Sequence, residues 1–584
     1  MRCSLLVATA VGLALVATSA AAAPARRPAP DSAILVTGQR LKADGKPIAM
    51  SDWRVAETEH VLLYARGDEK EIAATAARLE RLHFLLSILL NRVDTPDEAI
   101  KLRVYRYGDA ADFDALKLGH ARWQQGPYPH AFPTETYYDP REDGPVLATA
   151  ATSEQIMLQQ GRALDSLSQI TPPDPSTPGL TGRSFAGPSG APTGGVKVGE
   201  IAVAQGPDAR LYAGFARNFL LTYFPAAYPR WYVEGFGEIF ATMSFDGDAA
   251  IEYGRAPEGY RQVVETYGAY SLKSLLDGRY LSEKRSQTGW TPYHAWALAH
   301  LLFFSEEWKG PLHAYLAAIA SGADPAAAGA ALGDTAKLQR EWSAYHGARV
   351  PFERLTYPAG RFAEPYLRRL TQDEGEYVKG RLVLGARVEI AGVDEAERAG
   401  ALQRRGAWLA EIRTDGARRP ASVGAQLLAA EGSCRSGDFA PCGAAADTAL
   451  RLAPANPLAL EWKGEALLGQ ALAAPAGTGE ADLKAARSAI VRANRADTES
   501  PLPLLAYYRS YAGAQQPAPE AALLGLVKAN TAAPAAPAVR LPLGEALIPR
   551  DAAAARRILL PVAAGAYESP EKPAAQAALD KIGR

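Results

Sequence analysis

Residues 211–243 constrain the fold most strongly, because two apolar stretches with helical periodicity flank a short turn. They read LYAGFARNFLLTYFPAAYPRWYVEGFGEIFATM. In the first stretch Leu211, Phe215 and Phe219 recur every four residues, which predicts a helix with one apolar face. Two prolines then interrupt the period and predict a turn. The segment therefore predicts two helices that pack against each other.

The second helix of this pair carries Glu234 and Glu238, four residues apart on one face. Its sequence WYVEGFGE resembles the W-x-x-E-G-x-A-E segment of gluzincin-type zinc metallopeptidases. In that family an H-E-x-x-H helix comes first, its two His bind zinc, and its Glu activates the bound water. The resemblance implies that Glu234 stands where the family has its third zinc ligand.

The preceding helix departs from the family at the decisive place. The H-E-x-x-H positions fall on Ala213, Gly214, Phe215, Ala216 and Arg217. Ala and Gly carry no ligand atom, and a guanidinium stays protonated and repels a cation. We therefore expect a pseudoenzyme without catalytic residues, metal or cofactor, whose degenerate site comprises Ala213, Gly214, Arg217, Glu234 and Glu238.

Arg217 suggests what fills the space of the missing zinc. If it occupies the position of the second His, an ion pair between Arg217 and Glu234 is expected there. The alternative is that both are ordinary polar residues on solvated helix faces. The resemblance also makes Tyr293 the candidate residue on the oxyanion side of the site.

No other histidine set has the spacing of a metal site. His294 and His300 lie six residues apart in the predicted helix 291–308, about 240 degrees apart around its axis, and one helix cannot direct both at one ion. His300, among Leu and Phe, is expected to be a hydrogen-bonded core residue. The remaining histidines form no ligand-spaced set; they are His60, His83, His120, His130, His313 and His346.

The overall charge and the absent motifs exclude several classes of function. The 584 residues carry 63 Lys and Arg against 64 Asp and Glu, a formal net charge of −1, so a nucleic-acid partner is not expected. The sequence contains no G-x-x-x-x-G-K-[ST] phosphate loop and no G-x-S-x-G nucleophile motif. A protein or peptide is the expected partner.

The N-terminus predicts export to the periplasm or secretion. Residues 1–23 combine an early Arg, an apolar core and small residues ending in Ala-Ala-Ala, as in a cleaved signal peptide, and 24–50 read as a flexible mature end. No later segment is apolar enough for a stable membrane anchor. Cys434 and Cys442 are expected to form a local disulfide in an oxidising compartment, the alternative being two buried free thiols.

Strand and helix patterns alternate in a predicted domain at 51–365. Strands are predicted at 61–64, 100–107 and 146–152, and helices at 69–90 and 109–118. This order resembles the upper lobe of gluzincins and a family of secreted bacterial proteins of unknown function built on it. Residues 171–206, rich in Pro, Gly, Ser and Thr, predict a mobile insertion; a tolerated surface loop is favoured over a lid.

The rest of the chain predicts a linker and a helical-repeat domain, so that the fold class is α+β followed by α. A linker with a hairpin at 376–390 is expected within 366–420. Residues 449–459 and 489–497 resemble the junction between successive tetratricopeptide (TPR) repeats, which predicts TPR-like repeats over 421–584. Helices are expected at 423–436, 457–473, 481–494, 502–514, 519–530, 553–563 and 573–582. An irregular Ala-rich bundle is the alternative.

Three functions remain open on the sequence. The first is an exported non-catalytic protein that binds protein or peptide through the vacated cleft, the repeat surface or both. The second is an active zinc metallopeptidase with displaced ligands, such as His294 or His300 beside Glu234. The third is a structural envelope protein whose cleft is filled by aromatic side chains.

Overall fold

The computed structural model contains a unit that begins at Met50, the first residue of strand β1 (Met50–Glu57). The described residues are 48–95, 99–118, 136–151, 154–157, 201–257, 271–282, 291–388, 395–474 and 479–583. The predicted signal peptide, most of the flexible mature end and most of the insertion at 171–206 lie outside them. The part of the insertion that is described, Ile201–Gln205, is strand β7, paired with β6 (Glu154–Met157), and not loop.

A six-stranded mixed sheet forms the first half of this unit. Its strand order is β11-β1-β2-β3-β5-β4, in which the β2–β3 and β3–β5 pairs are parallel and the others antiparallel. The strands predicted at 61–64, 100–107 and 146–152 are confirmed as central strands of this sheet, and helices are present within the predicted ranges 69–90 and 109–118. The strands are β1 (Met50–Glu57), β2 (Val61–Arg66), β3 (Leu102–Tyr107), β4 (Tyr137–Asp139), β5 (Val146–Ala150) and β11 (Tyr366–Thr371). Because β11 pairs along β1, the sheet extends past the predicted domain boundary at 365.

Helices cover one face of the sheet and form the largest core. Helix α1 (Glu69–Leu89) begins where the Asp68 carboxylate accepts hydrogen bonds from two backbone N–H groups, both at 3.0 Å. It packs with the predicted helical pair, α3 (Ala209–Tyr223) and α4 (Arg230–Ala241), and with α7 (Thr291–Phe304) in one apolar cluster. The smaller elements of this half are α2 (Ala110–Asp114), β8 (Ser244–Asp246), β9 (Ala250–Tyr253), α6 (Leu272–Leu276), α8 (Lys309–Ala320), α9 (Pro325–Ala328), α10 (Thr335–Ala344) and β10 (Glu353–Thr356).

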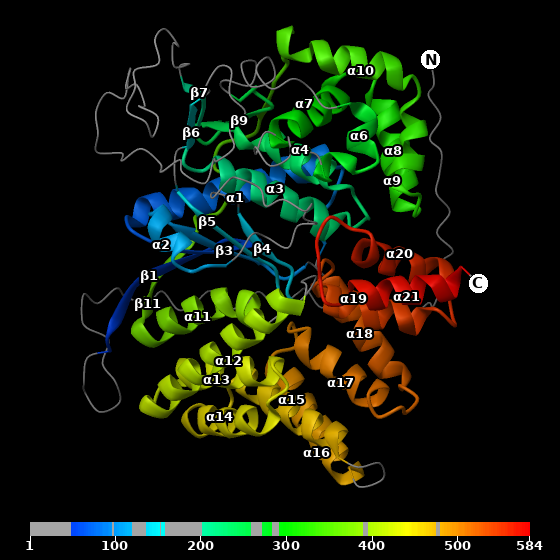
Figure 1. The fold of residues 1–584 in the computed structure, drawn as a ribbon. Coiled ribbons are helices and arrows are strands. Elements are labelled where there is room, and N and C mark those ends of the chain that lie inside the picture. Colours follow the sequence, from blue (N-terminus) through cyan, green and yellow to red (C-terminus); the bar gives the residue numbers. More distant parts are fainter. Residues whose placement is uncertain are drawn as a thin grey trace, which may run out of the picture. The chain divides into compact units, whose positions relative to one another are not determined.

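The predicted hairpin at 376–390 is wrong, because its described part, 376–388, belongs to helix α11 (Gln372–Val388). Helix α11 covers the second face of the sheet, opposite α1 and α3 (Figure 1). Strands as apolar as β5 need cover on both faces. Two glycines of α11 are close-packing positions. A β-carbon at Gly385 would come within 2.1 Å of Asp139 Oδ2, and one at Gly380 within 2.3 Å of Leu428 Cδ2.

The second half is a helical repeat-like region. After α12 (Glu395–Arg418), each helix packs against the next along the chain, as Figure 1 shows. The helices are α13 (Val423–Arg435), α14 (Phe439–Leu452), α15 (Pro457–Ala473), α16 (Glu480–Ala496), α17 (Leu502–Ala512), α18 (Glu520–Ala532), α19 (Pro537–Leu547), α20 (Ala552–Ala563) and α21 (Lys572–Ile582). The predicted linker at 366–420 is therefore β11 and two packed helices.

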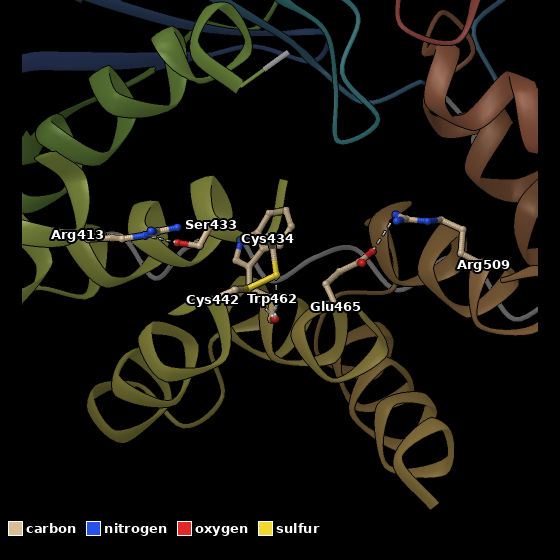
Figure 2. Close-up of a disulfide and its surroundings, with 7 residues drawn as sticks. All are labelled: Arg413, Ser433, Cys434, Cys442, Trp462, Glu465 and Arg509. Atoms are coloured by element: carbon tan, nitrogen blue, oxygen red, sulfur yellow. Dashed lines mark hydrogen bonds and ion pairs between the residues drawn. A yellow bond between two sulfur atoms is a disulfide. The ribbon is translucent and has the colours of Figure 1, made fainter. Parts of the chain in front are cut away.

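The predicted disulfide between Cys434 and Cys442 is present and joins the end of α13 to the start of α14. Figure 2 shows it beside Trp462 of α15, whose carbonyl oxygen lies 3.7 and 3.4 Å from the two sulfurs. Arg413 donates to Ser433 on one side of the bridge, and Arg509 pairs with Glu465 on the other. The bridge thus fixes the first helical pair where it meets the second. Across the described residues, we find no helix with the length and apolarity needed to cross a membrane.

Candidate functional site

The five positions of the predicted degenerate site all lie on α3 and α4. Ala213, Gly214, Arg217, Glu234 and Glu238 are each buried, and Tyr293 of α7 is buried as well. A β-carbon at Gly214 would come within 2.9 Å of both Leu147 and Thr136, so the position of the absent glutamate is closely packed. Helices α4 and α7 also approach closely, because a β-carbon at Gly235 would lie 2.3 Å from the Ala295 carbonyl oxygen.

The ion pair predicted between Arg217 and Glu234 is wrong. The Glu234 Oε1 accepts from Arg230 Nε at 2.7 Å, with the two side chains 4% and 1% exposed. Arg230 precedes Glu234 by one helical turn on α4, so both side chains already share one face. Arg217 Nη2 donates instead to Thr136 Oγ1 at 3.0 Å. The alternative of solvated helix faces fails too, since all of these side chains are buried.

Glu238 is also held by a guanidinium, which in this case comes from another helix. Arg210 of α3 donates to both of its carboxylate oxygens, at 2.6 and 2.9 Å. Such two-pronged pairs are strong and directional. Both glutamates of the WYVEGFGE segment therefore have arginine partners within the core.

His300 is the core residue that the sequence predicted. Its Nε2 lies 2.7 Å from the Gly254 carbonyl oxygen and its Nδ1 2.8 Å from the Tyr345 hydroxyl. A carbonyl oxygen only accepts, so Nε2 donates and Nδ1 accepts from the hydroxyl. Both ring nitrogens are thus engaged away from Glu234. Burial lowers the pKa of His300 to about 4.

This buried imidazole predicts acid sensitivity. The folded pKa of about 4 lies below the ordinary value of 6.5, so the unfolded chain binds this proton more tightly. Stability is therefore lost as the pH falls from 6.5 towards 4, by at most about 3 kcal/mol for this group. We expect urea unfolding at pH 7 and pH 4 to show a smaller pH effect in His300→Gln than in the wild type. Equal pH effects in the two proteins would contradict this assignment.

A cluster of histidines and carboxylates was missed by the sequence analysis, because no two histidines have the sequence spacing of a metal site. His60 and His83 stack with ring centroids 3.5 Å apart and planes at 11°. His60 immediately precedes β2, whereas His83 lies near the end of α1. A helix that packs against the strand preceding it in the chain runs antiparallel to that strand. The end of the helix therefore lies near the beginning of the strand. Spacing within one helix cannot reveal such a pair.

Two carboxylates complete this cluster. His60 Nδ1 lies 2.5 Å from Glu80 Oε1, and the backbone N–H of His60 donates to Glu80 Oε2 at 3.2 Å. His83 Nε2 lies 3.3 Å from Asp94 Oδ1, and Arg92 also pairs with Asp94. The only signal in the sequence was the pair Glu80 and His83, three residues apart on one helix and flanked by leucines.

Burial and the neighbouring charges shift the pKa values of this cluster. Burial lowers the pKa of His60, but the hydrogen bond and charge of Glu80 outweigh it and the net pKa is raised. Burial lowers the pKa of His83. Burial raises the pKa of Glu80, but its bond with His60 makes the net pKa lower than usual. The hydrogen bond with His83 lowers the pKa of Asp94 to about 2. Both carboxylates are therefore ionised at neutral pH.

The comparisons with known proteins identify no family for this chain. No protein-family model matches the chain, and no curated protein matches it. Among solved structures, the C-terminal helical region matches a thermophilic TPR protein of Thermus thermophilus. The match has 19% sequence identity and a TM-score of 0.26, and covers 32% of this chain and 93% of that one. The mixed α/β half has no such counterpart, so its resemblance to gluzincins stays a prediction.

Proposed function

We propose that this protein is non-catalytic and binds a protein or peptide through its helical-repeat region. Of the two binding surfaces that the sequence suggested, the vacated cleft loses support. Its glutamates are paired with Arg230 and Arg210, and the helices around them pack closely. The peptidase alternative needs Glu234 as a ligand and would have to break a buried ion pair first.

The helical-repeat region already binds another protein surface within the same chain, namely that of the α/β half. Arg435 of α13 pairs with Glu142, next to the sheet, at 2.7 Å. Further along, the backbone N–H of Ile100 donates to the Ala532 carbonyl oxygen of α18 at 2.8 Å. These surfaces are engaged by the chain's own α/β half, so a partner would use the parts of the helices that remain exposed.

The observation that carries the proposal is an apolar stripe on α18, defined as Leu524 and Val527. These side chains are 61% and 47% exposed, and they lie three residues apart on one helix face. The opposite residues of α18, Ala522, Leu526 and Ala529, pack into the repeat core and fix the helix. An apolar side chain of a partner laid on this stripe would remove it from water, which favours binding.

We expect a photo-crosslinking residue at position 524 of the full-length protein to yield a discrete adduct with one partner in the producing cells. The matched control is position 402 on α12, where Leu402 is 42% exposed. Val527→Glu should reduce the adduct about tenfold, since burying one such side chain contributes roughly 1.5 kcal/mol. The same adducts at 402 and 524, or none at 524, would contradict a docking role for the stripe.

We further propose that the protein works outside the cytoplasm. The signal-peptide pattern of residues 1–23 supports export, and the disulfide between Cys434 and Cys442 supports an oxidising compartment. The test is thiol alkylation of the protein in intact cells, where both cysteines should resist labelling until a reductant is added.

A further inference from the structure

We propose that His60, His83 and Asp94 form a binding site for a late first-row divalent cation, with Zn²⁺ as the best-matched ion. One ligand atom from each residue lies within 4.8 Å of the other two. Two imidazoles and one carboxylate are the donor set that zinc takes in sites with a fourth position for water. This inference is independent of the helical-repeat proposal, because the three residues belong to the α/β half.

His60 provides the first argument, because its free nitrogen is already oriented. Its side chain is 7% exposed, and among the described residues its Nε2 has no hydrogen-bond partner. The carboxylate of Glu80 holds Nδ1 and is itself held by the His60 backbone N–H. A carboxylate on one ring nitrogen favours the proton there and leaves the lone pair on the other, which is the usual arrangement behind a metal-binding histidine.

His83 and Asp94 provide the second and third ligands. The Oδ2 of Asp94 lies 3.9 Å from His60 Nε2, while its Oδ1 lies 3.3 Å from His83 Nε2. Phe219 and Tyr223 meet the His83 ring edge-on, at 5.0 and 5.6 Å between centroids, and limit its rotation. Asp94 is 41% exposed and opens the cluster to solvent, so an ion can enter without unfolding the core.

The charges around the cluster also favour a cation. Glu59, Glu80 and Asp94 face the two histidines, and Arg92 offsets part of that charge. The Arg92 guanidinium pairs with Asp94 and lies 3.8 Å from the centre of the Tyr223 ring. Because the two imidazole rings are almost parallel, their lone pairs run side by side, and chelation requires the rings to tilt towards each other. Binding of the cation would therefore displace the Arg92 guanidinium from the Asp94 carboxylate and change the stacking of the two histidine rings.

The test uses the full-length protein, stripped with a chelator and titrated with ZnCl₂ by calorimetry. We expect one zinc per chain, with His60→Gln and His83→Gln each weakening binding at least about 100-fold. The matched control is His313→Gln, an exposed histidine on α8 that should leave the affinity unchanged. Mg²⁺ should not compete, because it prefers all-oxygen sites.

A second variant guards against loss of the fold. Asp94 is partly exposed, so Asp94→Asn should fold normally and still bind zinc at least about 10-fold more weakly. Co²⁺ should give the intense visible absorption of a tetrahedral site in the wild type but not in the histidine variants. Absence of zinc binding in the wild type, or equal affinity in the wild type and all three variants, would overturn the proposal.

Discussion

Replacing Arg381 with Ala is expected to lower the free energy of unfolding by about 3–5 kcal/mol, the usual cost of removing one partner from a buried ion pair. Arg381 of α11 pairs with Asp143, beside the sheet, and with Glu431 of α13 at 2.8 Å. Its removal leaves the Asp143 carboxylate with Arg103 alone and the Glu431 carboxylate with Arg435 alone, and burial opposes the ionised form of both. The same arginine thus joins the α/β half to the repeat region.

The control for this prediction lies on the same helix. Lys379 of α11 is exposed, so Lys379→Ala should change stability by no more than about 0.5 kcal/mol. Urea denaturation followed by tryptophan fluorescence gives the midpoints of both variants, and limited proteolysis reports whether the repeat region has loosened. Equal midpoints for the two variants would show that the buried network does not hold the halves together.

The second large effect is expected at Glu234. Glu234→Ala should lower the free energy of unfolding by about 3–5 kcal/mol, because it leaves the Arg230 charge buried without its carboxylate. Glu411→Ala, at an exposed position on α12, is the matched control and should be nearly neutral. A peptidase would respond differently, with lost hydrolysis and lost zinc at nearly unchanged stability.

A double substitution separates the ion pair from its surroundings. If the cost of Glu234→Ala comes from the lost ion pair with the buried Arg230 guanidinium, then removing Arg230 as well should restore part of the stability. The variant Arg230→Met with Glu234→Leu keeps the volume apolar and should be more stable than Glu234→Ala alone. A double variant as unstable as the single one would place the cost in packing rather than charge.

Local patterns were enough where one segment of the chain decides its own structure. Helix α15 (Pro457–Ala473) has the predicted bounds, because Asn456 accepts a hydrogen bond from the Ala459 N–H and a proline follows it. The disulfide joins two cysteines eight residues apart, which proximity along the chain already suggested. The apolar period of 211–223 likewise predicted α3 from side chains of that helix alone.

Other features of the structure depend on contacts between segments that are far apart in the sequence, and local patterns did not predict them. The segment of α11 was predicted as a hairpin, and its place over the sheet depends on contacts with β1, β11 and α13. Glu234 was predicted to pair with Arg217, but its partner is Arg230 of the same helix, and Arg217 donates to Thr136 instead. The gluzincin-like site was predicted as a vacated space, yet its positions are filled by core packing.

The sequence by itself therefore determined the helices with a clear local pattern, the central strands and the disulfide, because periodicity, capping and short loops act over a few residues. Only the tertiary structure decided which charges pair and which histidines meet. His60 and His83 come from a strand and a helix that run in opposite directions, and their stacking depends on how α1 packs against β2. No local pattern specifies that packing, since it arises from the apolar faces of both elements together.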